Sequence, residues 1–315
     1  MEHKIIWFTE GNWGGKVPVN HPNMRNDMAW MHHLNVDHYP ILNMESVDDT
    51  YDLGIVTIPK TKVDYIMSYP LIENMRRICK KIAFMQEGPY WLFQDYPMYQ
   101  QIWFYNTLME MDALFVHNKC DIEYFSGITG KKCYLMKTLM IEDFIEESTD
   151  KLDAVMIGGN MVRWYGGFDS YLVAQQFNLP IHAPSMGRKI DREEEMDINH
   201  LPYMTWVEWI KELSKFKYAV HLMPTHAAGT FALNCAYWGI PCIGYEGLDT
   251  QQSCFPKLTV EMGDIFRAKQ LAERLVKDSS FYDTAVATAK NNYKSFFGRK
   301  EFDKSITKSI KEIME

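Results

Sequence analysis

The chain has 315 residues, which fits two domains of about 150 residues better than a single domain. Its formal net charge is −8, from 33 Lys and Arg against 41 Asp and Glu, which argues against a general binder of nucleic acid or anionic membranes. Its 6 cysteines form no C-x-x-C pair, and no apolar run is long enough for a signal peptide or a membrane span. We therefore expect a cytoplasmic protein with reduced cysteines and no transmembrane segment.

The first half of the chain alternates between buried-strand and helix patterns. Short apolar runs predict strands over residues 5–8, 53–58, 81–86, 113–117 and 134–136. Helical spacing occurs over residues 25–34 and, after a proline, over residues 98–111. A loop with Gly11, Gly14 and Gly15 separates the first strand from the first helix, which is how a Rossmann-like domain begins.

The second half restarts the same pattern after a polar, acidic segment over residues 142–153. Strands are predicted over residues 154–157, 179–183, 218–223 and 242–245. Helices are predicted over residues 168–177, 206–216 and 230–237, and a charged helical tail follows from residue 268. We therefore predict an α/β protein with Rossmann-like parallel-sheet domains over residues 1–148 and 149–290, and a tail over residues 291–315 that packs back on the first domain.

The most informative segment covers residues 223–247 and predicts a strand, a turn of small residues, a helix and a further strand. Gly229 and Thr230 would begin the helix, where unpaired backbone N–H groups and the helix dipole favour an anion such as a diphosphate. An ordinary strand–turn–helix connection explains the same pattern equally well.

This segment resembles the GT-B glycosyltransferases of the retaining type, which carry here a Glu, seven residues, a second Glu and a helix that ends in Gly-x-Pro. When Gly239-Ile240-Pro241 is aligned with that ending, the two acidic positions fall on His226 and Asn234. The spacing is therefore kept, while both carboxylates are replaced. The resemblance implies that His226 contacts the transferred sugar and that Asn234 binds a hydroxyl of the donor ribose.

A second resemblance covers residues 157–174, where the family has a strand that ends in Gly-Arg and then a Lys-Gly pair that helps to hold the donor diphosphate. Gly158 follows the strand, and Gly166 stands where the Lys is expected. We therefore assign the phosphate role to Arg163, with Arg188 as second choice, although a surface arginine in a loop is the alternative. The turn over residues 201–204 matches the segment that cradles the base, so Tyr203 is predicted to stack on the base or to be a core aromatic.

In the first half, Glu87 follows a predicted strand, at a place where many GT-B enzymes carry a His or an acidic residue that faces the sugar. The resemblance makes Glu87 and His226 the candidate catalytic residues; a turn carboxylate before Pro89 is the alternative for Glu87. The loop with Gly11, Gly14 and Gly15 would approach the donor or the acceptor.

The resemblance as a whole implies a GT-B fold, with an acceptor-binding first domain and a nucleotide-sugar-binding second domain that face a central cleft. We expect a glycosyltransferase that uses a UDP- or GDP-linked sugar as substrate, needs no other cofactor and, because the chain has no Asp-x-Asp, needs no metal. The segments around Glu87 and Trp164 resemble phage DNA α-glucosyltransferases and related phage enzymes. The acceptor stays open between a modified DNA base, a glycan and a small molecule. The alternatives are a nucleotide-sugar 2-epimerase and a degenerate, non-catalytic nucleotide-sugar-binding protein.

Overall fold

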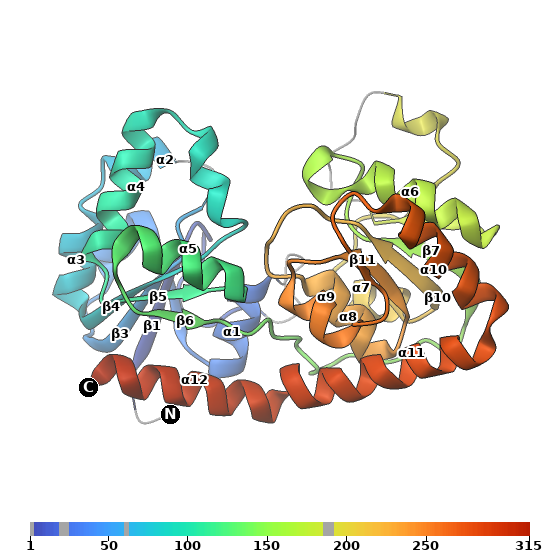
Figure 1. The fold of residues 1–315 in the computed structure, drawn as a ribbon. Coiled ribbons are helices and arrows are strands. Elements are labelled where there is room, and N and C mark those ends of the chain that lie inside the picture. Colours follow the sequence, from blue (N-terminus) through green and yellow to red (C-terminus); the bar gives the residue numbers. More distant parts are fainter. Residues whose placement is uncertain (1–2, 19–24, 60–62, 185–191) are drawn as a thin grey trace. The chain divides into compact units, whose positions relative to one another are not determined.

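The computed structural model describes residues 3–18, 25–59, 63–184 and 192–315. The chain divides into two compact units (Figure 1). The first unit consists of the described residues up to Lys137 together with Phe302–Glu315, and the second contains Thr138–Glu301. Across the described residues, no helix combines the length and the apolarity that a crossing of a membrane requires.

The first unit is built on a six-stranded sheet in the order β2-β1-β3-β4-β5-β6, and every neighbouring pair is parallel. Its strands are β1 (Ile5–Thr9), β2 (Asp37–Pro40), β3 (Tyr51–Val56), β4 (Cys79–Met85), β5 (Ala113–Val116) and β6 (Cys133–Leu135). The apolar runs predicted these strands to within two residues at each end, except for β2. That strand carries polar residues and a proline, which a sheet tolerates at its edge, so its sequence shows no strand pattern.

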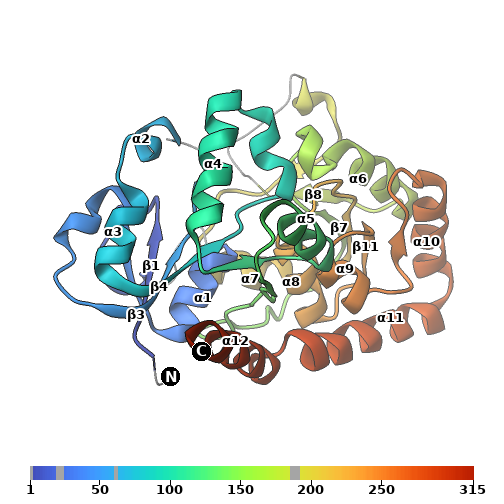
Figure 2. The same cartoon turned by 60° about the vertical axis from the view of Figure 1, so that its left-hand side comes forward.

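Helices cover both faces of this first sheet. On one face, α1 (Asn26–Leu34) meets α12 (Arg299–Met314), and the rings of Trp30 and Phe302 pack edge to face at 4.9 Å. The other face carries α3 (Leu71–Ile78), α4 (Met98–Glu110) and α5 (Lys119–Thr129), with the short α2 (Val63–Met67) against α4. Phe84 of β4 packs its ring against Phe104 of α4 and Phe125 of α5. Figures 1 and 2 show these helices on the side of the sheet away from α12. The core of the unit therefore lies on both sides of one buried sheet.

The second unit repeats the plan with a parallel six-stranded sheet in the order β12-β11-β10-β7-β8-β9. Its strands are β7 (Leu152–Ile157), β8 (Ile181–Ala183), β9 (Asn199–His200), β10 (Phe216–His221), β11 (Cys242–Tyr245) and β12 (Thr259–Val260). The strand predicted over residues 218–223 begins and ends two residues earlier. The reason is that the preceding helix ends at Leu213, so residue 216 already belongs to the strand.

The helices of the second unit fall into two groups. On one face α6 (Gly167–Ala174) packs with α10 (Ile265–Lys277), and on the other α7 (Trp206–Leu213) lies beside α8 (Thr230–Trp238). The indole Nε1 of Trp238 donates to the carbonyl oxygen of Ile210 at 3.0 Å, which ties α8 to α7. The short α9 (Asp249–Cys254) contacts α8, and α11 (Ser279–Asn292) contacts both α8 and α10.

Candidate functional site

Each sheet has one point at which the direction of strand addition reverses. In the first sheet, β2 lies on one side of β1 and all later strands lie on the other, so the reversal falls between β1 and β3. In the second sheet the corresponding point lies between β7 and β10. Connections that leave neighbouring strands toward opposite faces open a crevice at the carboxyl ends, where α/β proteins bind ligands. These two points are therefore the candidate sites of the two units.

At the reversal point of the second sheet, the loop after β7 packs directly on the end of β10. A side chain at Gly158 would collide with the ring of His221, the last residue of β10. Gly166 has a φ of 62°, and a side chain there would collide with the carbonyl oxygen of Leu222. The Oγ of Ser170, in α6, also accepts a hydrogen bond from the backbone N–H of Leu222 at 2.9 Å. The glycines predicted from the sequence thus allow two loops to meet closely at this edge.

The start of α8 lies at the same edge. Gly229 is its N-cap residue with a φ of 70°, and no side chain caps the N-terminus of the helix. Thr250, the second residue of α9, donates from its hydroxyl to the carbonyl oxygen of Gly229 at 3.0 Å and so holds the N-cap in place. The backbone N–H groups of the first turn, from Thr230 onward, are therefore positioned to bind an anion.

His226 and Asn234, the two positions that replace the family carboxylates, lie on either side of this helix start. His226 is half-buried above Gly247, where a side chain would collide with its ring. Burial lowers the pKa of His226, and the nearby Glu246 carboxylate only partly opposes that effect. Asn234 is buried within α8.

The remaining donor candidates differ in their exposure. Arg163 is exposed on a short 3-10 turn (Arg163–Tyr165) and has no ion pair with any residue that the structure describes. Tyr203 is 65% exposed just before α7, so it is not a core aromatic. Arg188 lies outside the described residues. Arg163 and Tyr203 are thus available to a ligand on the surface of the second unit.

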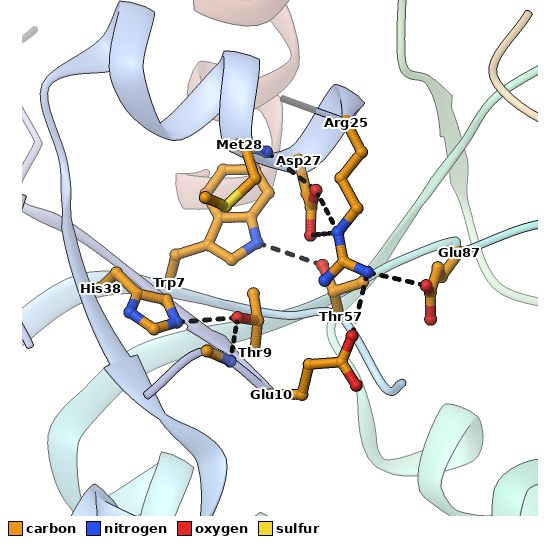
Figure 3. A network of polar contacts seen from close by, with 10 residues as sticks. Trp7, Thr9, Glu10, Arg25, Asp27, Met28, His38, Thr57 and Glu87 are labelled. Carbon is orange, nitrogen blue, oxygen red and sulfur yellow. Dashed lines mark hydrogen bonds and ion pairs between the residues drawn. The ribbon is translucent and has the colours of Figure 1, made fainter. Parts of the chain in front are cut away.

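In the first unit, a charged cluster lies at the carboxyl edge of the sheet (Figure 3). Arg25, the N-cap residue of α1, donates to Glu10 at 3.1 Å and to Glu87 at 2.9 Å, and its Nε donates to Asp27 at 2.9 and 3.1 Å. Burial disfavours the guanidinium charge, but Asp27, Glu87 and Glu10 outweigh it and raise the pKa of Arg25. Three carboxylates around one guanidinium leave two net negative charges at this edge.

The glycine loop after β1 is fastened to β2 next to this cluster. The Nδ1–H of His38 donates to the carbonyl oxygen of Trp13 at 3.0 Å, so its Nε2 accepts from the Thr9 hydroxyl at 2.8 Å. Gly15 exchanges two backbone hydrogen bonds of 2.8 Å with His38 in an antiparallel bridge, and Gly11 packs against the ring of the same histidine. Gly14 faces the ring of Tyr39. These contacts give the three glycines a structural role, and a ligand contact by the loop stays a prediction.

Several solved structures with the same architecture align with this chain over almost its whole length. Sucrose-phosphate synthase from Thermosynechococcus elongatus is 10% identical, with a TM-score of 0.73 and coverage of 98% of this chain and 99% of that one. HepE of Anabaena in complex with UDP and glucose is 10% identical, with a TM-score of 0.69 and coverage of 98% and 100%. An α-glucosyltransferase in complex with UDP-glucose and DNA containing an abasic site is 12% identical, with a TM-score of 0.67 and coverage of 99% and 100%.

The chain has the GT-B fold. The fold predicted from the sequence is thereby confirmed, with two parallel α/β sheets in succession. No model of a protein family matches the chain, and no curated protein matches it. The chain spans 55% of the length of TarM and 59% of that of the pneumococcal O-GlcNAc transferase GtfA, two larger proteins with a similar structure.

In this fold, Gly158 follows β7, Gly229 and Thr230 begin α8 at the same carboxyl edge of the second sheet, and Glu87 follows β4 at the carboxyl edge of the first. Three residues at these edges escaped the sequence analysis: Arg25, Asn160 and His221. Arg25 is separated from Glu87 by 62 positions, so no local pattern connects them. His221 could have been noticed as a histidine that directly follows the buried run of residues 218–220.

Proposed function

We propose that this chain is a glycosyltransferase that moves a sugar from a nucleoside diphosphate to an acceptor. The observation that carries this proposal is the combination, at one edge of the second sheet, of glycine-lined loops and the uncapped N-terminus of α8. Such an edge suits a diphosphate, because backbone N–H groups and the helix dipole both favour negative charge. The UDP-glucose of the α-glucosyltransferase structure and the UDP of the HepE structure support the same ligand class.

In this proposal the second unit binds the donor and the first unit binds the acceptor. The diphosphate contacts the loop at Gly158, the helix start at Gly229 and Thr230, and the guanidinium of Arg163. Asn234 binds the ribose, Tyr203 stacks on the base, and His226 contacts the transferred sugar. The charge that develops on the leaving diphosphate is balanced by a cation and a helix N-terminus, so we propose that transfer needs no metal ion.

A nucleoside diphosphate should raise the melting temperature of the second unit, because a ligand that binds only the folded state stabilises it by mass action. UDP or GDP at about 100 times its Kd adds about 2.7 kcal/mol, which corresponds to roughly 5–10 °C for a unit of this size. Differential scanning fluorimetry with UDP, GDP and their sugar conjugates measures the shift, and uridine serves as the control without phosphate. Failure of all of them to shift the transition at millimolar concentration would refute the donor assignment.

The same titration, followed by an activity measurement, separates an enzyme from a degenerate binding protein. With the donor that gives the largest shift, a glycosyltransferase releases nucleoside diphosphate slowly into water even without an acceptor. A protein that binds the donor without any release is non-catalytic. Transfer assays with that donor and with DNA, glycan and small-molecule acceptors then identify the acceptor class.

The variant Arg163→Ala should bind UDP about 10- to 150-fold more weakly, which equals the roughly 1.5–3 kcal/mol of a hydrogen bond to a charged group. Its fold should be unaffected, because the side chain is exposed and has no ion pair with another described residue. Isothermal titration calorimetry measures the affinity. The matched control is Arg274→Ala, which removes an exposed arginine that pairs with Asp278 at the far end of α10. If both variants and the wild type bind UDP with equal affinity, Arg163 is an ordinary surface residue that does not contact the donor.

A further inference from the structure

Two buried polar atoms at the reversal point of the second sheet have no hydrogen-bond partner within the described part of the chain. They are Nε2 of His221, whose residue is 6% exposed, and Nδ2 of Asn160, whose residue is 3% exposed. Buried polar groups in folded proteins are almost always hydrogen-bonded, because an unpaired one loses its water without compensation. Two such atoms at the carboxyl ends of neighbouring strands therefore point to a partner that the described chain does not supply.

Both residues belong to the structural elements that meet at the donor edge. His221 is the last residue of β10, and Asn160 follows β7 by three positions; β7 and β10 are neighbouring parallel strands. The ring of His221 lies against Gly158 on one side. On the other side it packs against Phe231, the second residue of α8, at 5.0 Å and 70°. The imidazole is thus enclosed between the glycine loop after β7 and the N-terminus of α8.

Both side chains are neutral and can donate a hydrogen bond: Asn160 through Nδ2, and His221 through Nε2 in the tautomer that carries its proton there. Burial lowers the pKa of His221 to about 4, so at neutral pH the ring carries one N–H and no charge. The Oδ1 of Asn160 accepts from the backbone N–H of Val162 at 3.2 Å, which leaves its Nδ2 directed elsewhere as a donor. Two hydrogen-bond donors beside a helix N-terminus suit a ligand with anionic oxygens, such as a phosphate. Binding such a ligand does not require a carboxylate at this edge.

We propose that Nε2 of His221 and Nδ2 of Asn160 donate hydrogen bonds to the diphosphate of the nucleotide-sugar donor. This inference rests on the proposed function, since it concerns the same donor edge. It adds two residues that the family pattern does not include: Asn160 in the glycine loop itself and His221 packed against that loop. Both acidic positions of the family's helix motif are replaced in this chain, by His226 and Asn234. The two proposed donors are also neutral, so they bind the phosphate without adding charge to this edge of the sheet.

The test compares UDP binding by the wild-type protein and by His221→Phe, measured by isothermal titration calorimetry. Phenylalanine keeps a ring of similar shape against Gly158 and Phe231 but removes the donor. We expect UDP affinity to fall about 10-fold or more, and uridine affinity to stay unchanged. His221→Gln, which can offer an N–H at a similar distance, should recover part of the affinity. Asn160→Asp, which exchanges a donor for a negative charge, should weaken UDP binding at least as strongly.

The matched control is His182→Phe. His182 lies in β8 of the same sheet, and its Nδ1 also has no partner among the described residues. Its ring packs on Phe216, the first residue of β10, and so lies toward the opposite edge of the sheet. UDP affinity of this variant should equal that of the wild type.

Each outcome bears on one claim. If the wild-type protein binds no nucleoside diphosphate, the proposed function fails. If it binds UDP and His221→Phe binds equally well, the proposed function stands and this inference is overturned. Should the variant not fold, ¹⁵N NMR of the imidazole in the wild-type protein decides: UDP must change the Nε2 resonance of His221, and an unchanged resonance at saturating UDP refutes the proposal.

Discussion

The variant Glu87→Gln should turn over about 10²-fold more slowly than the wild type, while its donor affinity stays nearly the same. A sugar that leaves its diphosphate develops positive charge in an oxocarbenium-like transition state, which a nearby carboxylate stabilises. The donor's own phosphate supplies part of that stabilisation. Since His226 and Asn234 occupy the acidic positions of the second unit, we propose that Glu87 supplies the rest.

Glu87 belongs to a cluster of three carboxylates around the guanidinium of Arg25. Its side chain is 18% exposed and lies 2.9 Å from the guanidinium of Arg25, which also contacts Asp27 and Glu10 (Figure 3). Because three carboxylates share one cation, the cluster keeps an excess of negative charge that an isolated ion pair would not have. Glutamine has the same size as glutamate, so the substitution removes the charge with little change in packing.

The matched control for this variant is Glu10→Gln. Glu10 contacts the same guanidinium at 3.1 Å, but it is 33% exposed, so it should affect turnover much less. Steady-state kinetics give kcat, calorimetry gives the donor Kd, and melting temperatures report on the fold. Near-normal turnover of Glu87→Gln would refute the catalytic role. Equal losses of turnover and of melting temperature in both variants would instead assign the cluster to structure.

The sequence predicted the strands of this fold well because parallel strands buried on both faces appear as short, continuous apolar runs. Residues 242–245 were predicted as a strand with the bounds that the structure has. The edge strand β2 was missed because its four residues, Asp37–Pro40, form no apolar run: three are half-buried, and the one buried residue is His38. Apolar runs therefore located the central strands of each sheet. They could not locate an edge strand whose position depends on hydrogen bonding to its one neighbouring strand.

The candidate sites were predictable only where they follow local rules. A glycine before a helix marks a helix start within a few residues, so Gly229 and Thr230 could be identified from the sequence. The pairing of Arg25 with Glu87 joins two loops 62 positions apart and depends on the order of the strands. The unpaired nitrogen of His221 required knowledge of burial and of every neighbouring polar atom. Contacts of this kind depend on the tertiary structure, so they cannot be predicted from local patterns in a single sequence.

Both units should lose stability as the pH falls from 6.5 toward 4, by about 3 kcal/mol for each buried neutral histidine. Burial lowers the pKa of His38 and of His117 in the first unit, and of His221 in the second, from 6.5 to about 4. Between these two values the unfolded chain binds a proton that the folded chain does not, so the free energy of unfolding rises with pH across this window. Stability is therefore full above pH 6.5 and declines below it.

The variant His117→Phe isolates one of these contributions. The ring of His117 is buried, and its Nδ1 has no partner among the residues that the structure describes. The backbone N–H of His117 donates to Oε1 of Gln86 at 3.0 Å, and the substitution leaves that bond in place. Phenylalanine should therefore remove one titrating group without breaking a contact. The slope of unfolding free energy against pH should then decrease by up to about 1.4 kcal/mol per pH unit in this window.

Urea unfolding at half-unit steps from pH 7.5 to 4.5 measures these slopes, with fluorescence at Trp30 to follow the first unit and at Trp238 to follow the second. The other tryptophans are replaced by phenylalanine in the protein used for each probe. Burial lowers the pKa of two histidines in the first unit, His38 and His117, and of three in the second, His182, His221 and His226, so both units should lose stability in this window. Carboxylates such as Asp52, whose pKa is lowered mainly by its hydrogen bond with Lys80, weaken the fold only below this window. A flat profile between pH 6.5 and 4.5, or an unchanged slope in His117→Phe, would show that these histidines become protonated within the folded protein.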